Sequence, residues 1–580
     1  MRSHAWRREW PQVRAISRAT FDGFLQNDLM PPGMQATALI WAAAFLVAPA
    51  VLLPAQLLGK YSFLRRFYPD RVEPALWNDR ALFILLSAGA IGVVAVVLWE
   101  TLLPARRDVF VLGPLPVASR VQSMGRLGGL LCLFAAFAAG LNAITSVIFP
   151  VVTSGTLRDA GRWAAAHLIA TVMADAFVFF SMTTLQGVVI LAVGRRAAER
   201  LATIMQTIVV MALLLTLLFI GPVREAVGAA LAQGNAGHVI LRWFPLAWFV
   251  GLYEALSGTT RPVMNALAWR ALAAGVAPLA ATIGLYAIGY GRLAARALET
   301  PDRSTGSMPV VAFARLVRFA FVRRGEEQAV CAFVLRVVSR SSRHRMLTAA
   351  YVGGAVAIIL ATLISAFVRA GAGLLAEPSV ATLSPPLILG AGLVVASRVL
   401  LAIPADLPAK WVFECMPLSP VRIGAGAHKA VLLISVPTVA LVALAPAMAM
   451  FGWRIAWQHT LFSVAMTVLL SEVLLLRFRG FPCARPYVPG RSRFHLLWPA
   501  YLTAFTVYTY TAAESERLLL RSGGLLTLTE IIAGLAAVVA ARRIYLLHRL
   551  DAVTFESDLP DTTFAGFNLS EGLAAQPRRG

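Results

Sequence analysis

The stretch ALFILLSAGAIGVVAVVLW at residues 81–99 contains neither a charged side chain nor a proline. As an α-helix rising about 1.5 Å per residue, a run of this length approaches the thickness of a bilayer hydrocarbon core, about 30 Å. Its apolar residues form one continuous block, whereas a helix on the surface of a soluble protein keeps one polar face. We therefore predict a transmembrane helix here.

The rest of the chain repeats this pattern. Of its 580 residues, 58% are hydrophobic and 14% are charged, and the mean hydropathy is +0.72. Apolar blocks of spanning length are separated by short polar segments, which predicts an all-α polytopic transmembrane helix bundle of about twelve spans. The predicted spans are 35–58, 81–99, 127–152, 165–193, 203–222, 265–289, 347–368, 384–403, 430–452, 455–476, 495–514 and 525–541.

The net charge of +23 would favour a nucleic-acid partner in a soluble protein, but here its placement along the chain matters more. With a cytoplasmic N-terminus, 36 of the 52 Lys and Arg residues fall on the inside and 14 on the outside. The distribution predicts a protein of a bacterial inner membrane with both termini cytoplasmic, a lipid bilayer as its partner and no nucleic acid. One loop conflicts with this rule, because five basic residues are predicted to lie outside. They are Lys60, Arg65, Arg66, Arg71 and Arg80.

The order of the segments predicts two halves. Residues 1–290 form a first six-span half that opens with an interfacial helix. In a helix over 4–27, the Trp and Phe residues lie along one side and Arg residues along a neighbouring side. Residues 291–346 form a basic cytoplasmic linker with a second interfacial helix. A second six-span half follows over 347–545, and a cytoplasmic tail over 546–580.

Two short proline-bearing loops occupy matching places, each between the second and third span of its half. The first reads ARRDVFVLGPLPVASR at 105–120, and the second reads DLPAKWVFECMPLSPVRIGAGAHKA at 406–430. Both contain Phe, three residues and then Pro-Leu. Proline fixes φ and restricts the preceding residue, and basic residues hold a loop in the cytoplasm, so such a segment suits rigid contact with a soluble partner. The alternative is a plain proline-terminated turn positioned by its charge.

This layout resembles the membrane subunits of type 2 ABC exporters. In that family an amphipathic helix precedes six spans, a coupling helix lies between spans two and three, and a re-entrant segment lies between spans five and six. Residues 221–262 look like the re-entrant connection, whereas the short external loop 515–524 and the fusion of two halves depart from the pattern. The resemblance implies a permease that works with a separate ATPase subunit. It assigns the contact with that subunit to Phe110, Pro114, Leu115, Pro116, Arg120, Phe413, Pro417, Leu418 and Arg422.

Motifs of catalysis are absent from the sequence. No GxxxxGK[ST] phosphate loop is present, so the chain does not supply an ATPase by that route, and neither HExxH nor GxSxG occurs. The four cysteines are scattered without ligand-like spacing. We predict neither an enzyme nor a bound metal or cofactor.

Ionisable residues within or near the predicted spans support an alternative. His167 and Asp175 are eight residues apart, so they lie on about the same side of a helix, two turns apart. A secondary transporter driven by an ion gradient would need such groups, whereas ordinary interhelical hydrogen bonding is the simpler interpretation. An integral-membrane enzyme is a third possibility for which no constellation is found. The intramembrane candidates are His167, Asp175, Arg398, Glu472 and Glu530.

Overall fold

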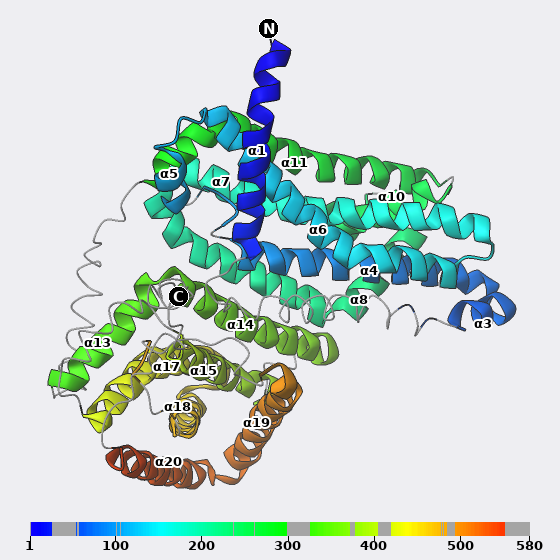
Figure 1. The fold of residues 1–580 in the computed structure, drawn as a ribbon. Helices are drawn as coiled ribbons and strands as arrows, with labels where there is room; N and C mark the ends of the chain where they lie inside the picture. Colours follow the sequence, from blue (N-terminus) through cyan, green and yellow to red (C-terminus); the bar gives the residue numbers. More distant parts are fainter. Residues whose placement is uncertain are drawn as a thin grey trace, which may run out of the picture. The chain divides into compact units, whose positions relative to one another are not determined.

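The protein is a bundle of α-helices in which no strand occurs among the described residues (Figure 1). The computed structural model divides into two compact units, which are described separately below. Unit 1 comprises Met1–Gly306, Ala349–Leu374 and Pro489–Trp498, and unit 2 comprises Ser307–Thr348, Leu375–Val488 and Pro499–Gly580. The structure describes residues 2–25, 59–298 except Glu100, Ala105, Ala236 and Thr260, then 325–371, 377–403, 419–476, 481–483 and 494–550, together with Pro54, Leu57 and Phe478.

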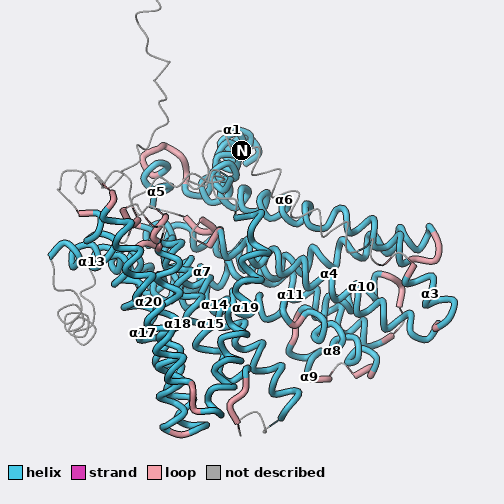
Figure 2. The backbone as a smooth tube through the Cα atoms, turned by 90° about the horizontal axis from the view of Figure 1, so that it is seen from below, coloured by secondary structure: helices cyan, strands magenta, loops and turns pink. Residues whose placement is uncertain are grey.

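Unit 1 contains long helices that run alongside one another and several short ones at their ends (Figure 2). Its long apolar helices are α4, α6, the first part of α7, and α11. The bounds are α1 Arg2–Leu25, α3 Lys60–Phe67, the 3₁₀ helix η1 Pro69–Arg71, α4 Val72–Val97, α5 Arg106–Leu112, α6 Ser119–Thr153, α7 Leu157–Leu218, α8 Ile220–Ala232, α9 Val239–Trp243, α10 Leu246–Leu256 and α11 Pro262–Ala297.

Two breaks shape the middle of unit 1. Helix α7 is interrupted at Gly194, whose φ of 77° is readily adopted by glycine, so the span Leu157–Gly194 ends there. The following helix turns by 76° between Leu218 and Ile220. Helices α8 and α10 then pack against α4, and α10 also packs against α7 and α11. The bend therefore lies within the predicted span 203–222, and the short apolar α10 lies within residues 221–262, which were predicted to form the re-entrant connection.

Unit 2 is built around α17 and α18, which pack along each other, with α15 against both and α20 against α18 (Figure 1). Helix α14 begins in unit 2, but its residues from Ala349 onward are assigned to unit 1, as are all of residues 349–374. The bounds are α13 Gly325–Arg340, α14 Ser342–Ala370, α15 Val380–Leu400, α17 Pro420–Phe451, α18 Trp453–Leu475, α19 Phe494–Ser522 and α20 Leu525–His548.

The structure bears out a polytopic bundle. Among the described residues, nine helices are long and apolar enough to cross a membrane, or ten if the bent pair counts as one span. The predicted span 35–58 lies almost wholly outside the described residues. The predicted span 495–514 lies in α19, which is not among the nine because threonine, tyrosine and charged residues interrupt its apolar sequence.

Each unit packs an amphipathic helix against the start of a long helix through small residues. In unit 1, α1 lies across α6 (Figure 1), and a Cβ added at Gly125 would lie 2.6 Å from the Cβ of Ile16. In unit 2, α13 packs on α17, and a Cβ added at Gly426 would lie 2.8 Å from the Glu327 carbonyl oxygen. Glycine is needed at both contacts because the backbones approach so closely. The two units thus share one local arrangement, α1 on α6 and α13 on α17.

Candidate functional site

The first proline-bearing loop forms the short helix α5 and a turn that leads into α6. Phe110 exposes 58% and Leu115 48% of its surface, and Pro114, Pro116 and Arg120 are exposed as well. Neighbouring exposed apolar side chains on a polar connection are a common feature of protein interaction sites. The residues of this first loop that are predicted to meet a partner therefore lie at the surface of unit 1.

The α5 segment is held in place by the buried Arg126 of α6. Its guanidinium forms an ion pair with Asp108 of α5 and donates hydrogen bonds to the carbonyl oxygens of Thr101, at 2.9 Å, and Leu103, at 2.6 Å. One buried arginine of α6 thus joins the connection that follows α4 to the start of α5. Sequence reasoning missed this role, although an acidic residue in the loop and a basic residue early in the next span were available as signals.

The second proline-bearing loop is only partly described. Phe413, Pro417 and Leu418 lie outside the described residues. Arg422, at the start of α17, forms an ion pair with Glu326 of α13 at 2.6 Å. Lys429, two turns further along α17, pairs with Glu327 at 2.5 Å. Helix α13 is therefore attached to α17 by charge as well as by close packing.

Asp175 lies at the centre of a buried polar cluster in unit 1. Its carboxylate accepts hydrogen bonds from the Ser87 hydroxyl of α4 at 2.9 Å and from the Asn142 amide of α6 at 2.7 Å. All three side chains are buried. Within the described parts of the chain, no basic side chain forms an ion pair with this carboxylate. The cluster joins three long helices through groups that are polar and, apart from Asp175, neutral.

His167 is buried on the same helix, two turns from Asp175, as the spacing predicted. Its ring lies among Phe83, Phe149 and Tyr253, with centroid separations of 5.8, 5.3 and 5.7 Å. Neither ring nitrogen has a hydrogen-bond partner among the described residues. The imidazole and the carboxylate thus occupy different surroundings, and no hydrogen bond joins them.

A buried ion pair lies close to His167. Arg80 of α4 pairs with Glu254 of α10, and both side chains are almost fully buried. The Arg80 guanidinium also stacks over the rings of Tyr253 and Trp163, at 4.1 and 4.7 Å from their centroids. A paired and stacked guanidinium is one of the few ways to bury this charge. The pair fastens the short helix α10 to the start of α4.

The residue before Arg80 on α4, Asp79, contacts two other elements. Asp79 accepts hydrogen bonds from Lys60 and from the Tyr61 hydroxyl, both at 2.6 Å, and Arg224 of α8 lies 3.6 Å away. Burial, with the Asp79 charge adding to it, raises the pKa of the Tyr61 hydroxyl above its ordinary value. Asp79 and its neighbour Arg80 together join α3, α8 and α10 to α4.

Three of the five basic residues that conflicted with the charge rule make contacts within unit 1. Lys60 and Arg80 are engaged in ion pairs. Arg65 donates to the carbonyl oxygens of Thr153 and Ser154, at the C-terminus of α6, where a positive charge is favoured by the helix dipole. These three residues serve the packing of α3, α4, α6 and α10, whereas Arg66 and Arg71 lie over the rings of Phe67 and Tyr68. A count of Lys and Arg residues in each loop could not separate the residues that form ion pairs within the protein from those that determine membrane topology.

Unit 2 has its own buried polar cluster around Glu472. The carboxylate accepts hydrogen bonds from the Arg543 guanidinium of α20, the shorter at 2.7 Å, and lies 3.4 Å from His428 Nδ1 of α17. The other ring nitrogen of His428 lies 2.9 Å from the Ser471 hydroxyl. These side chains are all buried. Glu472 therefore joins α18 to α17 and α20.

The remaining intramembrane candidates lie apart from these clusters. Arg398 donates to the Leu474 carbonyl oxygen at 3.2 Å and stacks over Phe478. Glu530 is exposed near the start of α20. A pair that sequence reasoning missed joins His459 of α18 to Glu516 of α19 at 2.6 Å, with both side chains buried.

Groups of acidic, histidine or cysteine side chains suited to a metal ion do not occur in the part of the chain that the structure describes. No protein-family model, no curated protein and no solved structure matches this sequence. The class that the fold defines is an all-α, multi-pass membrane protein.

Proposed function

We propose that this chain is the membrane-spanning translocation subunit of an ABC-type exporter and works with a separately encoded ATPase. The observation that carries the proposal is the α5 segment, an exposed apolar element that Arg126 joins to α6 and to the connection after α4. A coupling element must transmit a conformational change of a soluble partner to the transmembrane helices. A short helix bound to a buried arginine is suited to this, because it moves with the long helix behind it.

Two further features support the same proposal. The amphipathic helices α1 and α13 each pack on the long helix that follows a proline-bearing loop. In unit 1 the short helices α8 and α10 fold back against α4, as the expected re-entrant connection would. The Arg80–Glu254 pair ties that connection to α4, the helix whose other end leads to α5. Movement at α5 would therefore reach the re-entrant region through a single helix.

The direct test is whether the chain binds an ATPase. The full-length protein, tagged and purified from its native membrane in mild detergent, should retain an ATP-binding subunit and hydrolyse ATP. Phe110→Asp should reduce this association, because it places a charge on the proposed contact surface. Phe63→Asp is the matched control, since Phe63 is a similarly exposed phenylalanine on α3, remote from α5 in sequence and fold. Transport by vesicles that contain only this chain and an ion gradient would refute the proposal.

A secondary transporter driven by an ion gradient is the second candidate, and Asp175 is the observation that favours it. A buried carboxyl surrounded by hydroxyl and amide groups, with no ion pair to a cation among the described residues, is the kind of group that binds and releases a proton in carriers. Asp175→Asn should abolish transport by a carrier, whereas an ATP-driven permease should retain it. Recording ATP hydrolysis and transport on the same preparation separates the two candidates.

A further inference from the structure

The three polar side chains around Asp175 form a closed ring. The Ser87 hydroxyl oxygen lies 2.9 Å from each carboxyl oxygen of Asp175 and 3.0 Å from the side-chain oxygen of Asn142. The Asn142 amide nitrogen lies 2.7 Å from Asp175 Oδ2. All these separations are hydrogen-bond distances, so each of the three contacts in the ring requires a hydrogen atom.

The available hydrogen atoms can be counted because the orientation of the Asn142 amide is fixed. Its nitrogen also donates to the Ala138 carbonyl oxygen at 2.9 Å, which can only accept. The side-chain oxygen of Asn142 therefore faces Ser87 and accepts. Ser87 supplies one hydrogen to the ring and Asn142 another, so an ionised Asp175 leaves three contacts with two hydrogens. A proton on Asp175 Oδ1 completes the ring, since the carboxyl then donates to Ser87 and Ser87 donates to Asn142.

Charged side chains on the helices packed against α7 are engaged with other groups. Asp79 of α4 lies 3.6 Å from Arg224 of α8. Arg80 of α4 pairs with Glu254 of α10. Arg270 of α11 donates to a backbone carbonyl oxygen of α9 at 3.4 Å. Among the described residues, none of these groups forms an ion pair with the carboxyl group of the ring.

The other segments that could approach the ring are uncharged in sequence. Helix α6 carries no charged side chain over residues 127–153. Residues 29–59, which include the predicted first span, contain neither a charged residue nor a histidine. An ionised carboxylate that is buried without a cation costs several kcal/mol, whereas a neutral, hydrogen-bonded carboxyl group avoids this cost. Charge and hydrogen-bond geometry therefore both favour a proton on Asp175.

Several buried polar atoms without a hydrogen-bond partner among the described residues lie on one side of the ring. They belong to Ser146, one turn after Asn142 on α6, to both ring nitrogens of His167, two turns before Asp175 on α7, and to the hydroxyl of Tyr253, whose ring contacts the imidazole. The charge distribution predicts that this side leads to the outer end of both helices. Buried polar atoms that no protein group satisfies normally bind ordered water. Water at these positions would link the ring to the outside.

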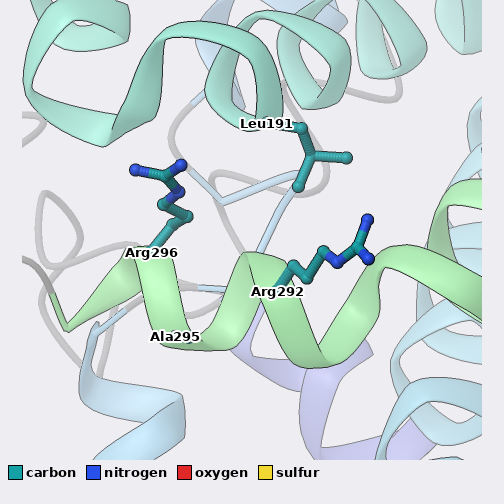
Figure 3. Close-up of a pocket in the computed structure, with 4 residues that line it drawn as sticks. All are labelled: Leu191, Arg292, Ala295 and Arg296. Atoms are coloured by element: carbon teal, nitrogen blue, oxygen red, sulfur yellow. The ribbon is translucent and has the colours of Figure 1, made fainter.

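Aromatic side chains pack on the opposite, inner side of the ring. Phe179 lies one turn after Asp175 on α7 and is fully buried, with its ring centroid 5.5 Å from that of Phe134 and 5.3 Å from that of Phe180. The pocket between α7 and α11 in Figure 3 lies further inward, about 24 Å along α7 from the ring. Its lining residues are Leu191, Arg292, Ala295 and Arg296. That pocket is therefore remote from the ring.

We propose that Asp175 is a proton-binding site, protonated in this arrangement, which exchanges its proton with the outer side through water bound at Ser146 and His167. When the proton passes to that water, two hydrogens remain for three contacts, and the ring that joins α4, α6 and α7 opens. The ring oxygens already touch at hydrogen-bond distance, which leaves no space for a metal ion between them. A neutral carboxyl group is compatible with an ATP-driven permease and with a carrier, so neither function is required for it.

Infrared spectroscopy of the full-length protein tests this site, because a protonated carboxyl group gives a carbonyl band separate from those of carboxylates and backbone amides. Spectra are recorded at neutral pH in H₂O and after transfer to D₂O. The test variant is Asp175→Asn, whose amide resembles the neutral carboxyl group and should preserve the fold. The matched control is Asp159→Asn, which removes a carboxyl group that is 40% exposed at the start of the same helix. Asn142→Leu and His167→Phe complete the set.

We expect a carboxyl band that Asp175→Asn removes and Asp159→Asn retains. Asn142→Leu should keep the band but shift it to higher frequency, because the carbonyl group loses a hydrogen bond. In D₂O the wild-type band should shift to lower frequency, and His167→Phe should slow this exchange. Identical carboxyl bands in wild type and Asp175→Asn would overturn the proton site, as would loss of the band on adding NaCl at constant pH, which would indicate a sodium site. Equal exchange in wild type and His167→Phe would overturn the outward route.

Discussion

Replacing Arg126 by methionine should release α5 from unit 1. Methionine keeps an unbranched apolar stem in the buried site and removes every hydrogen bond that the guanidinium donates. The lost partners are the Asp108 carboxylate and the carbonyl oxygens of Thr101 and Leu103. Only the α5 segment and the end of α4 depend on these bonds, so the effect should be local.

The magnitude follows from the exposure of the groups left behind. A hydrogen bond to a charged group contributes about 1.5–3 kcal/mol. Asp108 is 31% exposed and Thr101 is exposed, so water can replace most of what they lose. Leu103 is buried, so the loss of the hydrogen bond to its carbonyl group accounts for most of the free-energy cost. We therefore expect the free energy of local opening to fall by about 3 kcal/mol, which corresponds to roughly a hundredfold change in the opening equilibrium.

Hydrogen–deuterium exchange read out by mass spectrometry measures this change directly. Peptides covering residues 101–117 should exchange faster in Arg126→Met, while peptides from α17 and α18 should keep their wild-type rates. Arg120→Met is the matched control, because Arg120 is exposed in the same segment and its loss should leave exchange unaltered. Equal exchange of α5 in wild type and Arg126→Met would refute the idea that the arginine fixes this helix.

Four further predictions test other parts of the structure. Gly125→Ala should lower the thermal stability of the detergent-solubilised protein, by about 1–3 kcal/mol in free energy, because its Cβ meets Ile16, whereas Gly140→Ala meets no atom within 4 Å and should be neutral or stabilising. Glu472→Gln should cost about 3–5 kcal/mol in the same assay, since it leaves Arg543 buried without its partner; a similar loss from exposed Glu530→Gln would contradict this. Asp175→Asn should leave ATP-driven transport measurable, because the amide keeps the shape and much of the hydrogen bonding, and complete loss without any detectable ATPase coupling would favour the carrier. Cysteine labelling should find residues near 115, 310, 415 and 560 on the cytoplasmic side and residues near 235 outside, and labelling of 115 and 415 from opposite sides would exclude two matching halves.

The positions of most long helices could be predicted from the sequence because a bilayer acts locally on the chain. Any uncharged run of spanning length must satisfy its own backbone hydrogen bonds, and a helix does so without help from distant residues. The run at 81–99 is therefore recognisable alone. The short apolar helix around Glu254 was recognisable for the same reason, because its apolar sequence is too brief to span.

The contacts that give those helices their arrangement came only from the tertiary structure. Arg80 appeared in the sequence as a misplaced outside charge, yet its partner Glu254 lies 174 residues away. Nothing local to either residue specifies the pairing, since it depends on α10 folding back against α4. The bend after Leu218 was likewise hidden, because an apolar run has the same composition whether it is straight or bent. Local hydrophobicity fixes which segments become helices, whereas long-range packing decides which buried charges meet, and so where α5 and α10 are held.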